Sequence, residues 1–227
     1  MQNYVESFQI ASQRTDALAG GMSNYPLKID SGLTINIASV VAQIAKDFSE
    51  FLPHTDVLPG QCFRIARELS YILFDLGIRH TVTVGDIELV DGFYVGLNLE
   101  KFVRDVANGY RLEFVDGLPA GKPIEPHAWI TLENGFVVDA TVLASQHCKS
   151  SNPEEVLSFE DAVYFTGKRN TRVIRHIPML NGFVYYQKVL TARRNGDLQN
   201  YRQWYEDYAL GMARLDLFRL APGLSAW

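Results

Sequence analysis

Residues 59–78, PGQCFRIARELSYILFDLGI, predict a helix that begins near Cys62 and ends at Gly77. Pro59 and Gly60 interrupt the chain before this helix, and a glycine readily takes the left-handed turn that closes one. Apolar residues recur every three or four positions, as in a helix that buries one stripe of its surface. They are Phe63, Ala66, Leu69, Ile72, Leu73 and Leu76. We therefore expect the fold to be built around this helix.

Cys62 stands in the first turn of the expected helix. A thiol there faces unpaired backbone N–H groups and the positive end of the helix dipole, and both favour the thiolate, which is the nucleophilic form. The same amides could bind a developing oxyanion. The alternative is that Cys62 is a small buried hydrophobic residue, as most cysteines of intracellular proteins are.

Composition is that of an ordinary globular protein: 227 residues, 47% hydrophobic and 21% charged. A net charge of -5 without a basic cluster argues against nucleic-acid binding. The chain does not begin with a basic segment followed by an apolar run, and no apolar stretch is long enough for a membrane span. The two cysteines, Cys62 and Cys148, exclude a disulfide framework. We expect a cytoplasmic protein whose thiols are free.

The expected organisation is an N-terminal arm at residues 1–30 and a single domain at 31–227. Gly20, Gly21 and Pro26 interrupt the arm, which would pack on the domain or mediate an oligomer contact. Within the domain we expect an inserted segment at 97–126 and a C-terminal helical extension at 196–220. The oligomeric state is left open by the sequence.

Hydrophobic periodicity and turn residues predict the remaining elements. A glycine at position 85 marks a β-bulge in the first expected strand. The expected elements are a helix at 34–52 capped by Thr34, strands at 80–90 and 93–97, a helix at Leu99–Ala107, a strand at 110–115, a polar loop at 145–155, a helix at 153–164, strands at 172–177 and 182–190, and a helix at 198–220.

Residues 127–142, HAWITLENGFVVDATV, predict a β-hairpin with a two-residue type I′ turn at Asn134-Gly135. In a regular hairpin of this kind, the numbers of two paired residues add up to 269, so each odd-numbered residue pairs with an even-numbered one. Paired residues share a face of the sheet, so His127 and Asp139, which both have odd numbers, would lie on opposite faces. A bulge, a different turn length, or a position of His127 just before the strand would bring the two side chains together.

A thiol at a helix start, a histidine and an aspartate follow one another along the chain as Cys62, His127 and Asp139. The histidine can take the thiol proton, and the carboxylate can orient the ring and fix its tautomer. The resulting thiolate attacks a carbonyl carbon, and the helix-start amides stabilise the oxyanion. Cysteine needs less activation than serine for this chemistry at neutral pH.

These residues carry a family resemblance. GQCFRIARELSYILFDLGI followed by HAWITLENGFVVDAT resembles the transglutaminase-like branch of the papain-fold cysteine enzymes, over roughly residues 59–142. The resemblance implies a papain-like α+β fold, with an antiparallel sheet packed against the helix that starts at the cysteine. It implies Cys62 as nucleophile, His127 as base and Asp139 as orienting acid, with base and acid converging from neighbouring strands. Trp129 and Thr141 match the pattern beside them.

The sequence departs from that pattern in two respects. The separation of 65 residues between Cys62 and His127 is longer than in many small members, so the segment at 97–126 would be an inserted lid or substrate-binding element. The second oxyanion donor is not evident. Gln61 is the nearest candidate, although the papain pattern places its glutamine further upstream, and Trp129 is a candidate for contact with the substrate.

The expected function is acyl transfer through a thioester on Cys62, with peptide or amide hydrolysis first. Transamidation, glutamine deamidation and N-acyl transfer are alternatives, because they differ in what resolves the acyl-enzyme. The substrate would be a peptide, a protein or a small amide, and no cofactor or metal is expected. Two rivals remain: a non-catalytic binding protein of the same fold, and a zinc site that takes a fourth ligand from His147 or Cys148.

Overall fold

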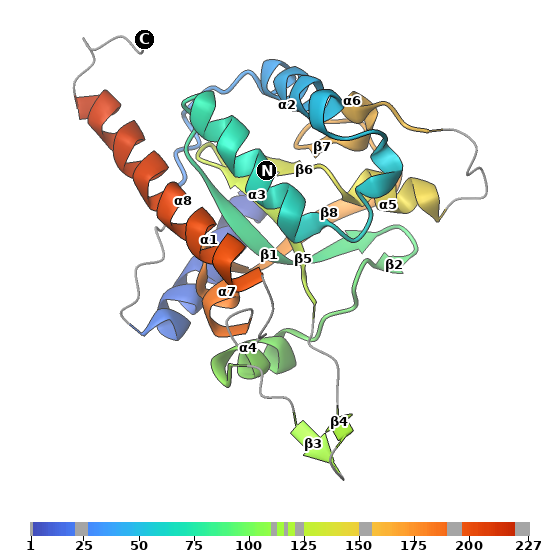
Figure 1. The fold of residues 1–227 in the computed structure, drawn as a ribbon, viewed down its shortest axis with the longest axis vertical. Coiled ribbons are helices and arrows are strands. Elements are labelled where there is room, and N and C mark those ends of the chain that lie inside the picture. The colour runs from blue at the N-terminus through green and yellow to red at the C-terminus, as the bar shows by residue number, and fades with distance from the viewer. Residues whose placement is uncertain are drawn as a thin grey trace.

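The computed structural model describes residues 2–20, 27–109, 113–115, 118–120, 125–149, 156–189 and 197–220. Every strand pair in these ranges is antiparallel, and helices cover the sheet, so the fold class is α+β, as the sequence predicts (Figure 1). The elements are α1 (Gln2–Ala19), α2 (Ile37–Phe51), η1 (Thr55–Val57), α3 (Cys62–Asp75), β1 (His80–Leu89), β2 (Gly92–Phe93), α4 (Leu99–Ala107), β3 (Glu113–Val115), β4 (Leu118–Ala120), β5 (His127–Leu132), β6 (Val137–Asp139), α5 (Val142–Cys148), α6 (Phe159–Ala162), β7 (Tyr164–Phe165), β8 (Val173–Asn181), α7 (Val184–Val189) and α8 (Asp197–Leu220).

The long strand β1 organises the main sheet. One edge of β1 pairs with β5 and then with β2, and its other edge pairs with β8. Strands β6 and β7 continue the sheet beyond β5. The register between β1 and β8 shifts at Val84/Gly85, which confirms the bulge expected at Gly85. A Cβ atom at position 85 would lie 2.1 Å from the carbonyl oxygen of Ile177, so only glycine fits under this bulge.

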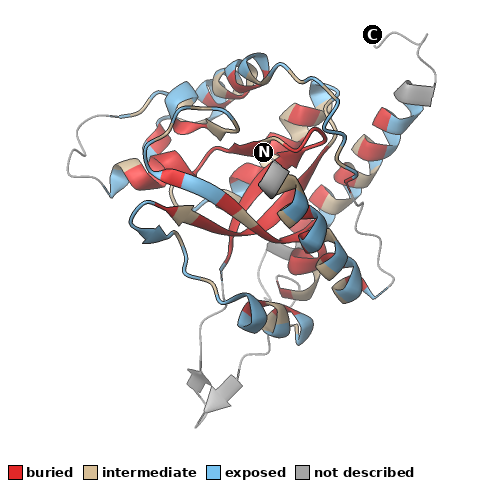
Figure 2. Ribbon diagram, turned by 180° about the vertical axis from the view of Figure 1, so that it is seen from behind, coloured by how far each residue is buried: buried red, intermediate tan, exposed pale blue. Residues whose placement is uncertain are grey.

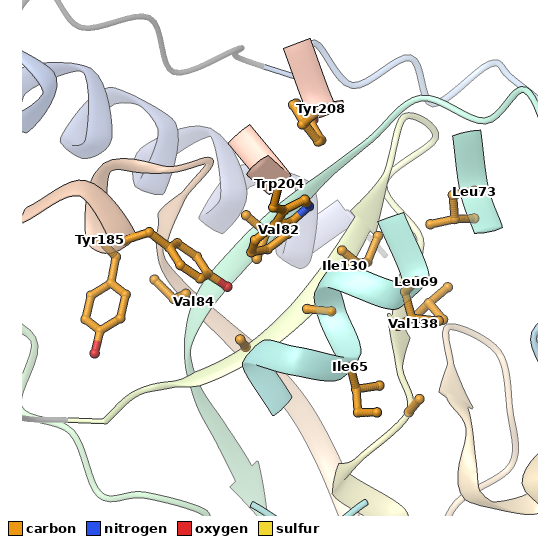
Figure 3. Close-up of a cluster of buried hydrophobic side chains, with 14 of the residues drawn as sticks. Ile65, Leu69, Leu73, Val82, Val84, Ile130, Val138, Tyr185, Trp204 and Tyr208 are labelled. Carbon is orange, nitrogen blue, oxygen red and sulfur yellow. The ribbon is translucent and has the colours of Figure 1, made fainter. Parts of the chain in front are cut away.

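Helix α3 packs its apolar stripe on one face of the sheet. Ile65, Leu69 and Leu73 are buried against strand side chains (Figure 3). The helix ends as expected, because Gly77 has a φ of 70° and its N–H bonds the carbonyl of Phe74. The strand residues in this core are Val82, Val84, Ala128, Ile130, Leu132 and Val138. Their alternation assigns the remaining residues of β1, β5 and β6 to the opposite face.

Helix α1 covers that opposite face, so the two sides of the sheet are closed by different helices (Figure 1). Figure 2 shows α1 lying across the buried strands. Phe8 and Thr15 are buried in this layer, and the Tyr4 hydroxyl lies 2.7 Å from Thr131 Oγ1. The first part of the expected arm is therefore an 18-residue helix packed on the sheet. Residues 21–26 lie outside the described ranges.

The hairpin between β5 and β6 turns through three residues, so the two-residue turn predicted from the sequence is wrong. Ile130 pairs with Val138 and Thr131 pairs with Val137, so the numbers of paired residues add up to an even number. The N–H of Gly135 bonds the carbonyl of Leu132, and Gly135 has a φ of 85°. This combination is a three-residue loop closed by a left-handed glycine. Odd-numbered residues of β5 then pair with odd-numbered residues of β6. His127 and Asp139 therefore lie on the same face of the sheet.

Local predictions were wrong for residues 182–190, for residues 145–148 and for the cap of α2. Residues 182–190 do not form a strand, because Val184–Val189 is the helix α7, buried on nearly all sides and therefore without an amphipathic pattern. Residues 145–148 do not belong to a loop but to α5, whose first turn is capped by Asp139. The N-cap residue of α2 is Asn36, two residues after the expected Thr34.

The remaining expectations are met in part. Helix α4 has the predicted bounds, and α8 occupies most of the expected extension at 196–220. The expected insertion at 97–126 contains α4 and the β3–β4 hairpin. Residues 110–112, 116–117 and 121–124 of this segment and 150–155 of the expected polar loop and helix lie outside the described residues.

Candidate active site

His127 and Asp139 form a buried pair. Nε2 of His127 lies 2.6 Å from Oδ2 of Asp139, and each side chain is 1% exposed. His127 is the first residue of β5 and Asp139 the last of β6, and the three-residue turn gives both the same orientation. A carboxylate so placed fixes the ring orientation of a histidine and holds the proton on Nε2.

Asp139 accepts hydrogen bonds at both oxygens. Oδ1 receives the backbone N–H groups of Thr141 and Val142 at 3.0 and 3.1 Å, and the hydroxyl of Thr141 at 3.1 Å. Burial alone would raise the pKa of Asp139, but the charge and hydrogen bond of His127, together with those of His176, lower it well below its usual range. The carboxylate is therefore ionised although it is excluded from water.

The pKa of His127 is shifted in the opposite direction, upwards. Burial lowers its pKa, while the charge and hydrogen bond of Asp139 and the neighbouring thiol of Cys62 raise it by more, so the net pKa lies above the usual value for histidine. Nε2 is occupied by Asp139, and Nδ1 is buried without a hydrogen-bond partner in the described residues. Because Nε2 contacts Asp139, we infer that Nδ1 is the ring nitrogen that faces Cys62.

Cys62 is the first residue of α3, and this end of the helix lies over β5 (Figure 1). The thiol is free and partly exposed. The side chain of the N-cap residue, Gln61, makes no capping hydrogen bond, so it does not occupy the backbone N–H groups that a helix leaves unpaired in its first turn. The structure thus pairs the predicted base with the predicted orienting acid, and the predicted nucleophile lies near enough to His127 to influence its pKa.

His176 on β8 is a member of the site that sequence reasoning missed. Its Nε2 lies 3.0 Å from the same Oδ2 atom of Asp139, and its side chain is 1% exposed. Burial lowers the pKa of His176 and the charge of His127 adds to this effect, while the hydrogen bond and charge of Asp139 oppose it. Nothing local in the sequence marks this residue, because its place opposite Ile87 depends on the bulged register of β1 and β8.

Aromatic rings enclose both imidazoles. The Tyr94 ring meets His127 edge to face with a centroid separation of 4.8 Å, and Trp129 lies 6.0 Å away on a nearly parallel plane. Trp129 also contacts His176, with centroids 5.0 Å apart. The Trp129 indole is 1% exposed and donates to Tyr4 Oη at 2.8 Å, so it packs the site from the α1 side and offers no open surface to a substrate.

The loop that carries Tyr94 is held by a second buried carboxylate, Asp86. Oδ1 of Asp86 accepts the N–H groups of Ile87 and Val95, and Oδ2 accepts those of Gly96 and Leu97, all between 2.7 and 2.9 Å. Asp86 is 1% exposed. It takes no part in the site itself but fixes the backbone that places Tyr94 beside His127.

A cavity of about 560 Å³ opens at the start of α3 and includes both sequence neighbours of Cys62. Gln61 and Phe63 line it from α3, and Tyr185 and Trp204 line it from α7 and α8. Gln61 is the N-cap residue of α3, and its exposed side chain makes no capping bond. The candidate second oxyanion donor therefore lines this cavity.

The zinc alternative gains no support from the geometry. In the described ranges, no three side chains of His, Cys, Asp or Glu are arranged to hold a metal ion. His147 and Cys148 lie at the end of α5, and Cys148 is exposed.

No protein-family model, no curated protein and no solved structure matches the chain. Among the described residues, no helix combines the length and the apolar composition that crossing a lipid bilayer requires. The argument for function therefore rests on the residues of the site.

Proposed function

We propose that this protein is a cysteine-dependent acyl-transfer enzyme with a papain-like, transglutaminase-like fold. Cys62 is the nucleophile, His127 the general base and Asp139 the residue that orients the base. The observation that carries the proposal is the buried pair of His127 and Asp139, which leaves Nδ1 of His127 without a hydrogen-bond partner in the described residues.

The proposed reaction begins with transfer of the Cys62 proton to Nδ1 of His127, which gives a thiolate and an imidazolium. The raised pKa of His127 supports this transfer. The thiolate attacks the carbonyl carbon of an amide, and the carbonyl π electrons move to oxygen. When the C–N bond breaks, its electron pair stays on nitrogen, which takes the imidazolium proton. A thioester on Cys62 and a free amine result.

Water completes the cycle in the hydrolytic reaction. His127 removes a proton from the water molecule as its oxygen attacks the thioester carbonyl. The C–S bond then breaks, the carboxylic acid leaves, and Cys62 returns to its starting state. An amine in place of water gives transamidation by the same steps, so the acyl-enzyme is common to both outcomes.

The start of α3 supplies electrophilic stabilisation in this proposal. Cys62 is the first residue of the helix, and the side chain of its N-cap residue, Gln61, makes no capping bond, so the first-turn amides and Gln61 are the candidate donors to the oxyanion. The cavity of about 560 Å³ is within the size range of small-molecule and peptide-side-chain sites. Its walls carry Arg64 and aromatic rings, which suit an acyl substrate of a peptide or small amide.

Mass spectrometry of the acyl-enzyme tests the proposal. The protein is exposed to a panel of p-nitrophenyl esters, peptides and glutamine-containing peptides and quenched in acid. The intact mass then shows whether an acyl group is attached, and digestion shows which residue carries it. We expect an acyl group on Cys62 that disappears on further incubation in water or with an amine.

Two variants control the experiment. Cys148→Ser removes the exposed thiol and is expected to leave the adduct unchanged, whereas His127→Gln is expected to reduce its rate of formation by about a hundredfold or more. Acylation of Cys62 at equal rates with and without His127, or acylation of Cys148 alone by every ester of the panel, contradicts the proposal and favours a non-catalytic binding protein.

A further inference from the structure

Two imidazoles meet at one oxygen atom. Nε2 of His127 and Nε2 of His176 lie 2.6 and 3.0 Å from Oδ2 of Asp139, while Oδ1 is occupied by the start of α5. Both rings are 1% exposed on their side-chain atoms. A triad needs only one of these histidines, so the second bond is a feature that the proposed function leaves unexplained.

The second bond changes the charge that His127 faces. A hydrogen bond to Oδ2 stabilises the carboxylate charge and disperses it, so a carboxylate with two imidazole donors is a weaker partner for each of them. The bond from His176 also restrains the position of Oδ2 relative to His127. Without His176, the full charge of Oδ2 would act on His127 and hold its proton more tightly.

The other groups around His176 leave Asp139 as its main electrostatic partner. Tyr164 on β7 contacts its ring with a centroid separation of 4.8 Å, and burial keeps the pKa of that phenol raised. Arg175, the preceding residue of β8, is paired with Glu88 at 2.6 Å. Tyr4 on α1 and His176 both line a second cavity, of about 290 Å³, and Tyr4 hydrogen-bonds Thr131 and Trp129. The charged groups that face His176 are thus Asp139 on β6 and His127 on β5.

We propose that His176 is a positioning residue of this site, whose ring donates Nε2–H to Asp139 and thereby sets the pH at which His127 gives up its proton. The inference rests on the proposed function for its catalytic meaning. The hydrogen bond and its effect on His127 are measurable without any activity.

NMR titration of ¹³C-histidine-labelled protein in a Cys62→Ser background tests the inference. The Cys62→Ser change removes the thiol, so the titration of His127 reports its imidazole and carboxylate partners alone. We expect His176→Phe to raise the pKa of His127 by about half a unit to one unit, that is three- to tenfold in proton affinity. The His127 signal is assigned with His127→Gln.

The matched control is His176→Gln, because the amide nitrogen of glutamine can stand where Nε2 of histidine stands and donate to Oδ2. We expect this variant to keep the wild-type titration of His127. If His176→Phe does not fold, His176→Asn serves instead, because its shorter amide does not reach Oδ2. An unchanged or lowered pKa of His127 in the variants without the donor overturns the inference, as does a shift of equal size in His176→Gln.

A pH profile of Cys62 alkylation in the native background separates this inference from the proposed function. If the His127 titration shifts as expected but alkylation of Cys62 is independent of His127, the positioning role stands and the acyl-transfer proposal fails. If alkylation depends on His127 but neither titration nor profile changes in His176→Phe, the acyl-transfer proposal stands and the positioning role fails.

Discussion

Nε2 of His127 lies 2.6 Å from Oδ2 of Asp139, although twelve residues and a tight turn separate the two along the chain. The pairing of Ile130 with Val138 makes this contact geometrically possible, because residues of equal parity then share a face. The carboxylate of Asp139 is buried, and it accepts hydrogen bonds from donors on β5, β8 and the start of α5. Stability and the proposed chemistry both depend on this one buried charge.

Asp139→Asn is expected to lower the free energy of unfolding at pH 7 by about 3–5 kcal/mol, because it leaves the partners of a buried charge unpaired. The folded-state pKa of Asp139 is below its unfolded value of 3.8, so this stabilisation is present above that value and declines as pH falls below it. Guanidinium unfolding at pH 3 to 7 checks both points. A wild type and variant that differ by the same amount at every pH would contradict the shift.

Asp86→Ala is expected to lower the free energy of unfolding by about 3 kcal/mol or more, because four backbone N–H groups lose a charged acceptor. Asp86→Asn retains one acceptor oxygen and should lose less. Hydrogen exchange provides the local readout, with protection lost at Val95, Gly96 and Leu97. Unchanged protection at these amides in Asp86→Ala would show that the loop is held by other contacts.

His80 makes the fold sensitive to mild acid. It is fully buried, and burial lowers its pKa to about 4 from a usual 6.5. The unfolded chain therefore binds a proton in this interval that the folded protein does not, and stability falls as pH drops from 6.5 towards 4. We expect His80→Phe to remove about 2 kcal/mol of the loss between pH 7 and 5. Equal slopes of unfolding free energy against pH in both proteins would rule this out.

Gly85→Ala is expected to destabilise the protein by about 2–3 kcal/mol, because the added Cβ would collide with the backbone of Ile177 on β8. Gly32→Ala is the matched control, since its Cβ would meet only the side chain of Asp30 at 3.3 Å, and a change within about 0.5 kcal/mol is expected. Thermal unfolding compares the two. Similar losses at both positions would mean that the close approach at Gly85 is not what constrains it.

Much of this architecture was predictable because its signals are local. The apolar stripe of α3, the glycine at 77 and the β-rich composition of β1 and β5 each specify an element without reference to the others. The order of Cys62, His127 and Asp139 likewise suggested a site before its geometry was known. These features share one property, a period or a motif contained in a short window.

The features that were predicted wrongly or not at all depend on contacts between segments that are far apart in the sequence. Helix α7 is enclosed by neighbours from α3, α4 and α8, so its tyrosines resemble those of a strand. The place of His176 depends on a bulged register between strands about ninety residues apart along the chain. The hairpin turn differed by a single residue from the prediction, and that residue decides which side chains meet. Long-range register is not encoded in any local window.

Alkylation of Cys62 as a function of pH tests the central claim most directly. Iodoacetamide labelling is followed at the peptide level from pH 5 to 9, with the exposed Cys148 of the same chain as internal reference. The account predicts that labelling of Cys62 reaches half its maximal rate at a pH at least about one unit lower than that of Cys148, and that His127→Gln abolishes this difference. Superimposable pH profiles for the two thiols, unchanged by the His127 substitution, would contradict it.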